Sequence, residues 1–176
     1  MPKSATDFDA YFTSYPDFPK KGILFRDISP LLASPEGMAK AVSCFIEILR
    51  PFDIDIIAGI ESRGFLFSTL LASHMDIGSI MIRKPGKLPG ELVKTKYELE
   101  YGASELTMQH GAGVKSQNVL IVDDLLATGG TISAAKTLLI SQQAKVIGCA
   151  VVIELTALGG REVVNLPVAA LQSYSE

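Results

Sequence analysis

The sequence predicts one α/β domain in which helices flank a parallel β-sheet, and two observations favour this fold class. First, apolar runs rich in β-branched residues alternate with segments whose apolar residues recur at helical spacing. Second, apolar residues make up 48% of the 176 residues and charged residues 20%, a composition that suits a sizeable buried core and argues against disorder. We therefore expect a single domain over residues 1–176.

The first elements along the chain are expected to be helices. Thr6–Tyr15 fits a short amphipathic helix, which the following PDFP sequence closes. A second helix is expected to begin at Ser34-Pro35-Glu36, because serine is a favoured N-cap residue and a proline and an acid both suit a first helical turn. Apolar residues from Met38 to Leu49 keep the i, i+3, i+4, i+7 spacing, and Pro51 ends this helix.

Strands and helices then alternate along the chain. Buried strands are expected at Ile54–Gly59, Ser79–Ile82, Val119–Val122 and Val146–Leu155, and helices at Arg63–His74 and from about Gly130 to Gln142. Residues 84–113 interrupt this alternation, because they are polar, contain glycines and prolines, and include an alternating run at Lys94–Tyr101. We expect a hairpin flap over a site there, with an ordinary surface hairpin as the alternative.

Charge and cysteine content narrow the class of protein. The formal net charge is −3, so no global positive field would attract nucleic acid. Cys44 and Cys149 lie far apart in apolar segments, which predicts two buried thiols in a reducing compartment. The two histidines form no cluster with them, which argues against a zinc site. The N-terminus is no signal peptide and the apolar runs are too short to span a membrane, so we expect a soluble, cytoplasmic protein.

The stretch Val119–Thr131, VLIVDDLLATGGT, carries the strongest functional signal. Asp123 and Asp124 are expected at the end of a strand, where ligands of parallel sheets bind. The small residues after them would let backbone N–H groups approach a phosphate at a helix N-terminus. Two aspartates would repel that phosphate, so they need a group that donates hydrogen bonds or becomes positive. A ribose 5-phosphate that reacts at its anomeric carbon provides both, whereas an isolated acid pair would be an N-cap beside a solvated turn.

Several other site motifs do not fit the sequence. No G-K-[ST] follows the glycines of Val119–Thr131, so this is no Walker A loop, and the dinucleotide fingerprint G-x-G-x-x-G is absent. Ser62 could be a hydrolase nucleophile, but Ile60 occupies the first glycine position of the G-x-S-x-G elbow. A receiver domain would carry its acid pair near the N-terminus rather than as late as Asp123.

Val119–Thr131 resembles the phosphoribosyl-diphosphate signature of the type I phosphoribosyltransferases. Further segments, in collinear order over nearly the whole chain, resemble the members of that family that use adenine: Phe18–Leu32, Ala58–Phe67, Ile82–Gly90, Leu99–Leu106 and Val151–Glu162. The resemblance implies the type I phosphoribosyltransferase fold, with a small N-terminal hood at residues 1–33 and a flexible flap at residues 84–113. It also implies transfer of the 5-phosphoribosyl group from 5-phosphoribosyl 1-diphosphate to adenine, which gives AMP and diphosphate in purine salvage.

The resemblance assigns roles to individual residues. Leu24, Phe25 and Arg26 would form the adenine pocket, with Phe25 stacked on the purine. The catalytic residues would be Glu100, Asp123, Asp124 and Arg63, with Glu100 as the proton-transfer group. A non-proline cis peptide is implied before Ser62. The sugar diphosphate would be bound by Ser62, Arg63, Arg83, Lys84, Lys87, Tyr101, Asp123, Asp124, Ala127, Thr128, Gly129, Gly130 and Thr131.

The resemblance further implies a magnesium ion carried by substrate oxygens and water, with no direct protein ligand, and a homodimer. Two alternatives stay open. The chain could serve another base, although Ala127 stands where relatives that use 6-oxopurines commonly have an aspartate. It could also be a non-catalytic sensor of the sugar diphosphate, although such regulators usually carry a DNA-binding module and this chain is acidic.

Overall fold

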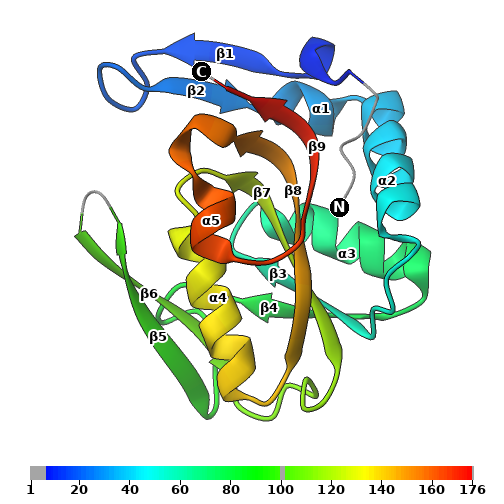
Figure 1. Cartoon of the computed structure of the whole chain (residues 1–176), viewed down its shortest axis with the longest axis vertical. Coiled ribbons are helices and arrows are strands. Elements are labelled where there is room, and N and C mark those ends of the chain that lie inside the picture. Colours follow the sequence, from blue (N-terminus) through cyan, green and yellow to red (C-terminus); the bar gives the residue numbers. More distant parts are fainter. Residues whose placement is uncertain (1–6, 100–101, 176) are drawn as a thin grey trace.

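A central parallel sheet with helices on both faces forms the body of the molecule (Figure 1). The structure is a computed structural model that describes residues 7–99 and 102–175. The sheet has the strand order β4-β3-β7-β8-β9, and every neighbouring pair in it is parallel. Its strands are β3 (Ile56–Ile60), β4 (Gly78–Ile82), β7 (Asn118–Leu126), β8 (Lys145–Leu155) and β9 (Val168–Tyr174). The predicted fold class is therefore confirmed.

Two hydrophobic cores lie on the two faces of this sheet. Successive strand residues point to opposite faces, so Ile57 packs into one core and Ala58 into the other. One core is covered by α2 (Pro35–Leu49) and α3 (Gly64–Met75), and the other by α4 (Gly130–Ser141) and α5 (Gly160–Val164). The sheet is thus buried on both sides, as parallel sheets generally are.

The predicted boundaries are mostly within two residues of the observed ones. The helix expected at Ser34-Pro35-Glu36 begins there, because the Ser34 hydroxyl oxygen accepts a hydrogen bond from the Gly37 N–H at 3.0 Å, and it ends before Pro51. The strand predicted at Val119–Val122 is the exception. It continues to Leu126 as β7, because the long neighbour β8 pairs with it throughout. Asp123 and Asp124, which were predicted at the end of this strand, therefore lie within it, shortly before its last residue Leu126.

The helix predicted at Thr6–Tyr15 was also wrong. Within its described residues only Asp9–Tyr11 are helical, as the 3-10 turn η1, and Thr13–Pro16 form strand β1. This strand pairs antiparallel with β2 (Leu24–Asp27), from Thr13 opposite Asp27 to Pro16 opposite Leu24, so strand pairing overrides the local helical pattern. The short helix α1 (Ser29–Ala33) follows. The described part of the hood lies over the carboxyl ends of β7 and β8 (Figure 1).

The segment at residues 84–113 contains the expected hairpin. Its strands β5 (Leu92–Leu99) and β6 (Gly102–Gln109) pair antiparallel and stand beside the sheet (Figure 1). Backbone hydrogen bonds of 2.7 and 2.8 Å between Arg83 and Thr107 join it to the end of β4. The remaining short element, η2 (Thr156–Leu158), follows β8.

Neither Cys44 nor Cys149 takes part in a disulfide. Cys149 is fully buried, as predicted, and burial raises its pKa to about 12. Cys44 is half-buried, so the prediction of complete burial was wrong for this residue. In the described part of the chain, no helix is long and apolar enough to cross a bilayer.

Candidate active site

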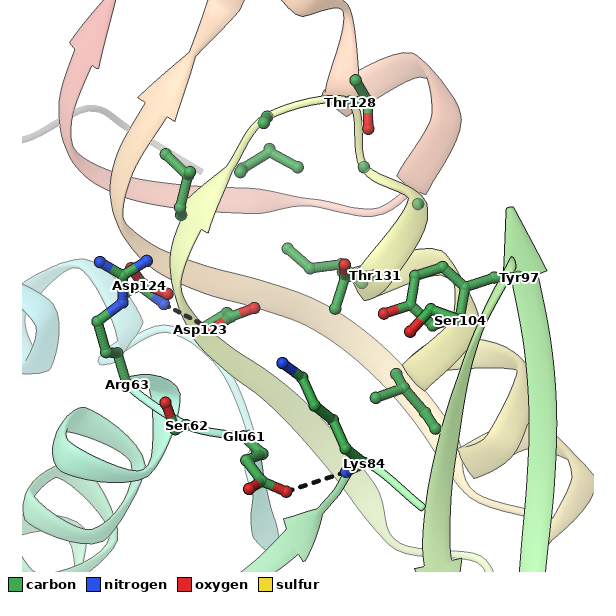
Figure 2. A pocket seen from close by; sticks show the side chains of 17 residues that line it. Glu61, Ser62, Arg63, Lys84, Tyr97, Ser104, Asp123, Asp124, Thr128 and Thr131 are labelled. Carbon is green, nitrogen blue, oxygen red and sulfur yellow. Dashed lines mark hydrogen bonds and ion pairs between the residues drawn. The ribbon is translucent and has the colours of Figure 1, made fainter. Parts of the chain in front are cut away.

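Two adjoining cavities open at the carboxyl ends of β3, β7 and β8. The first, of about 390 Å³, is the acidic cavity, and the second, of about 510 Å³, is the apolar cavity. Both are lined by Arg63 and Asp124, which therefore lie where the two spaces meet. Most residues predicted to bind the sugar diphosphate line the acidic cavity (Figure 2): Ser62, Arg63, Lys84, Asp123, Asp124, Ala127, Thr128, Gly129, Gly130 and Thr131.

The acid pair, Asp123 and Asp124, forms the floor of the acidic cavity. Each residue is 8% exposed, and the Asp124 N–H donates to Asp123 Oδ1 at 2.9 Å. Burial, and then the neighbouring charge of Asp124, raise the pKa of Asp123 well above its ordinary value. Arg63 Nη2 lies 2.8 Å from Asp124 Oδ2. A ligand that donates hydrogen bonds or carries positive charge would therefore be favoured beside Asp123.

The phosphate turn, Ala127–Thr131, joins β7 to α4. Gly129 is the N-cap of α4 and has a φ of 86°, in the left-handed region that favours glycine. A Cβ at Gly129 would lie only 2.6 Å from the Gly160 carbonyl oxygen, so there is also no space for a side chain at this position. The first N–H groups of a helix have no intrahelical acceptor. Here the first residues of α4 line the cavity, and Figure 2 shows the Thr131 side chain there, an arrangement suited to an anion.

The turn after β3 carries Glu61, Ser62 and Arg63. The peptide between Glu61 and Ser62 is cis, as the family resemblance implied. The helix that follows lies close to β7, since a Cβ at Gly64 would be 2.6 Å from the Val122 carbonyl oxygen. This close approach brings Arg63 from its own strand end to the acid pair.

The predicted basic cluster divides into two groups. Lys84 lines the acidic cavity, and Figure 2 shows its side chain extending toward Asp123. Arg83 lines neither cavity: its guanidinium donates to both oxygens of Glu61 at 3.2 Å and to the Lys87 carbonyl oxygen at 3.0 Å. Burial acts to raise the pKa of Glu61, but hydrogen bonds from Arg83 and the Lys84 N–H bring it below its ordinary value. Lys87 is likewise not a lining residue, so only Lys84 of the three reaches the cavity.

The apolar cavity lies between the hood and the end of β8. The residues predicted for adenine, Leu24, Phe25 and Arg26, line one wall. Phe18 meets the Phe25 ring edge-on at 5.2 Å between centroids. The sequence analysis did not predict the opposite wall, which is formed by residues at the end of β8 and in η2: Ile153, Leu155, Ala157 and Leu158. These residues could have been considered because they lie in the family-like segment Val151–Glu162.

The flap reaches the acidic cavity through residues that were not predicted. Tyr97 on β5 and Ser104 on β6 face each other in the hairpin register, and both line the cavity (Figure 2). Leu106 follows them on the same face of β6. The predicted residues Glu100 and Tyr101 lie outside the described residues. The alternating pattern around Tyr97 could have indicated which face of the hairpin turns inward.

Comparisons with known proteins agree on one family. Residues 29–166 match the family model described as the phosphoribosyl transferase domain. The adenine phosphoribosyltransferase of Gluconacetobacter diazotrophicus is 46% identical over 176 residues, which is 100% of each chain. That of Synechococcus sp. strain CC9605 is 51% identical over 170 residues, 96% of this chain and 99% of the relative.

Solved structures with the same name share the fold. The crystal structure of the Thermoanaerobacter pseudethanolicus protein superposes with a TM-score of 0.91 at 40% identity, covering 94% of this chain and 96% of that one. The Saccharomyces cerevisiae protein, complexed with an imino-altritol bisphosphate and adenine, has a TM-score of 0.86 at 41% identity, with 90% and 93% covered.

Proposed function

This chain belongs to the phosphoribosyl transferase family, and we propose that it joins adenine to 5-phosphoribosyl 1-diphosphate, releasing AMP and diphosphate. It is a pentosyltransferase of purine salvage. The observation that carries the assignment within the molecule is the position of the acid pair. Asp124 lines both the acidic cavity, which contains the turn at Ala127–Thr131, and the apolar cavity. An anomeric carbon beside Asp124 would therefore have the phosphate on one side and the base on the other.

The phosphate turn is proposed to hold the 5-phosphate. Its backbone N–H groups and the hydroxyls of Thr128 and Thr131 would donate to the phosphoryl oxygens, and the positive end of the α4 dipole would favour the charge. A phosphate placed there leaves the ribose ring over the acid pair. The ribose hydroxyls would then donate to Asp123 and Asp124, which contribute charge rather than phosphate binding.

The acid pair is proposed to stabilise the reacting sugar. The bond to the diphosphate stretches first and positive charge develops on the ribose, while nitrogen 9 of adenine approaches the anomeric carbon from the opposite face. Two carboxylates, each 8% exposed, act strongly on that charge because little water screens them. Burial raises the pKa of Asp123 well above its ordinary value, and hydrogen bonds donated by the ribose hydroxyls would favour its charged form.

The departing diphosphate is proposed to meet Arg63, Ser62 and Lys84. Arg63 would exchange its ion pair with Asp124 for a forked contact to two diphosphate oxygens, a geometry that guanidinium groups favour. Arg83 and Lys87 remain predicted contacts for the same group. The structure offers Arg83 an additional role, since its paired contact with Glu61 supports the turn that carries Ser62.

Magnesium is proposed as the metal ion of the reaction. Within residues 7–99 and 102–175, no group of three or more His, Cys, Asp or Glu side chains gathers that could hold a metal. The acidic cavity instead offers the acid pair, which fits an ion that keeps its waters and binds chiefly through substrate phosphates. When bound, magnesium would offset the negative charge of the leaving diphosphate.

The adenine site is proposed in the apolar cavity. Phe25 would stack on the purine, the backbone of Leu24 and Arg26 would read its edge, and Leu155 and Leu158 would cover the other face. Glu100 remains the predicted proton-transfer group and Tyr101 a predicted lid. Tyr97 and Ser104 bring the described part of the flap to the acidic cavity and would help to exclude water.

A homodimer and a cytoplasmic location are also proposed. Leu66 and Leu70 on α3 and Met81 on the edge strand β4 are 45%, 37% and 49% exposed, which suits an apolar contact with a second copy. Light scattering would show twice the mass of one chain, and Met81→Arg would reduce it. Two cysteines that form no disulfide suit a reducing compartment.

An acceptor screen tests the proposed function. Protein, magnesium and 5-phosphoribosyl 1-diphosphate are incubated separately with adenine, hypoxanthine, guanine and orotate, and nucleotide and diphosphate are measured. AMP should form with adenine alone. A nucleotide of another base would overturn the choice of adenine, and tight binding of the sugar diphosphate without any product would identify a sensor.

A further inference from the structure

The helix α5 lies directly behind the phosphate turn, with backbone against backbone. A Cβ at Gly160, its first residue, would be 2.2 Å from the Ala127 carbonyl oxygen and 2.8 Å from Leu126 Cδ1. On the other side of the same contact, a Cβ at Gly129 would meet the Gly160 carbonyl oxygen. The two backbones are packed tightly against each other, so a shift of α5 toward the turn would displace the turn.

An ion pair between half-buried Arg161 and buried Glu154 holds α5 in this place. Arg161 directly follows Gly160, and its Nε and Nη2 donate to the two carboxylate oxygens of Glu154, the latter at 2.7 Å. Glu154 is 2% exposed and lies on β8 opposite Leu126, the last residue of β7. The same carboxylate accepts from the Ser173 hydroxyl of β9 at 3.1 Å. The pair thus ties α5 to the strand beside the turn.

Two further contacts fix the far side of α5. Arg161 Nη1 donates to the Val168 carbonyl oxygen at 3.3 Å, which reaches the start of β9. Lys136 on α4 donates from Nζ to the Val164 and Asn165 carbonyl oxygens at 3.0 and 3.3 Å. The helix α4, which begins in the phosphate turn, is therefore linked to α5 as well.

We propose that Glu154 and Arg161 are positioning residues for the phosphoribosyl substrate, acting through Gly160 on the N–H groups of the phosphate turn. This inference rests on the proposed function, because it assumes that the turn binds the 5-phosphate. Neither side chain lines the acidic or the apolar cavity, so any effect on the substrate is indirect. If this ion pair served only folding, its loss would lower the stability of the protein and leave the affinities of the folded protein unchanged.

The test compares affinities at the two ends of the site. Arg161→Lys keeps the charge but loses the forked contact with Glu154, so the turn should shift. We expect the Kd for ribose 5-phosphate, measured by calorimetry, and the KM for the sugar diphosphate to rise about tenfold or more, because losing one hydrogen bond to a charged group costs about a factor of ten in affinity. The KM for adenine should not change. Unchanged phosphate affinity, or an equal rise in both KM values, would overturn the proposal.

A glycine pair provides the matched control and a second variant if Arg161→Lys does not fold. Gly160→Ala places a methyl group against Ala127 and should weaken ribose 5-phosphate binding in the same way. At Gly159, whose φ is 66°, a Cβ meets nothing within 4 Å, so Gly159→Ala carries backbone strain without pushing on the turn. Equal losses in the two variants would contradict the proposal. If the wild type binds ribose 5-phosphate but makes no AMP, the proposed function fails while this comparison still decides the inference.

Discussion

The two cavities differ in how firmly their walls are held. The acid pair lies on β7, in the middle of the sheet between β3 and β8, and the turn after it is packed against α5. One wall of the apolar cavity comes instead from the hood, a two-stranded sheet on which Leu24 is 39% exposed. The sugar end is thus set by the core and the base end by a peripheral layer. Substitutions at the sugar end should therefore alter turnover, whereas substitutions at the base end should mainly alter the affinity for the base.

The largest effect is expected at the acid pair. Asp124→Ala removes a carboxylate from the place where the sugar becomes cationic, so turnover should fall about 100- to 1000-fold. The fold should survive, which circular dichroism can verify. Glu47→Ala is a suitable control, because it removes an equal charge from the exposed face of α2. Turnover near that of the wild type would remove Asp124 from the mechanism.

The hood should show the opposite kinetic pattern. Phe25→Ala removes the aromatic face proposed for the purine, and base stacking of this kind contributes about 1–3 kcal/mol. The KM for adenine should therefore rise about tenfold, with little change in the KM for the sugar diphosphate. Phe18→Ala is the matched control, because Phe18 touches Phe25 but is 53% exposed and lines neither cavity. A fall in kcat without a change in adenine KM would contradict the division of roles.

A smaller effect is expected at Asp123, where a substitution should increase the stability of the protein. Burial raises its pKa above the unfolded value of 3.8, so the stability that protonation provides is present below that value and is lost as pH rises toward the folded pKa. Asp123→Asn removes this loss and should stabilise the protein by about 0.5–2 kcal/mol at neutral pH while activity falls. The gain should shrink as the pH is lowered to 4. Destabilisation at neutral pH, in thermal unfolding, would contradict this account.

The smallest effect is expected where the hood joins the sheet. The Tyr174 hydroxyl of β9 donates to Asp9, and the Arg26 guanidinium lies 3.9 Å from the centre of the Tyr174 ring. Tyr174→Phe keeps the ring and loses the hydrogen bond, which should cost about 0.5–1.5 kcal/mol in chemical denaturation. Adenine KM should rise slightly with kcat unchanged. A loss of kcat instead would show that the hood affects the reacting centre directly.

The sequence predicted the sugar end of the site better than the base end. The phosphate turn could be predicted because its signal is contiguous: a strand, two acids, small residues and a helix in thirteen positions. The strand that carries the acid pair was nevertheless predicted to end at Val122, since nothing local shows that β8 pairs with it as far as Leu126. The hood strand β1 was missed because the spacing of its own residues suggested a helix, and only the pairing with β2 makes it a strand.

Two long-range contacts were equally invisible in the sequence. Arg83 was expected at the diphosphate, yet Glu61, 22 residues away, binds its guanidinium. Leu158 lies in a family-like segment but has no local pattern that places it opposite the hood. In both cases the contact depends on which strand ends lie together, and that is set by the packing of the whole sheet.

A crystal structure with ribose 5-phosphate bound tests the central claim most directly. The account requires the phosphoryl group within hydrogen-bonding distance of the N–H groups of Ala127–Thr131, and the ribose hydroxyls on Asp123 and Asp124. A sugar phosphate bound with its phosphoryl group at Arg63 and Lys84, or anywhere away from the acid pair, would contradict it.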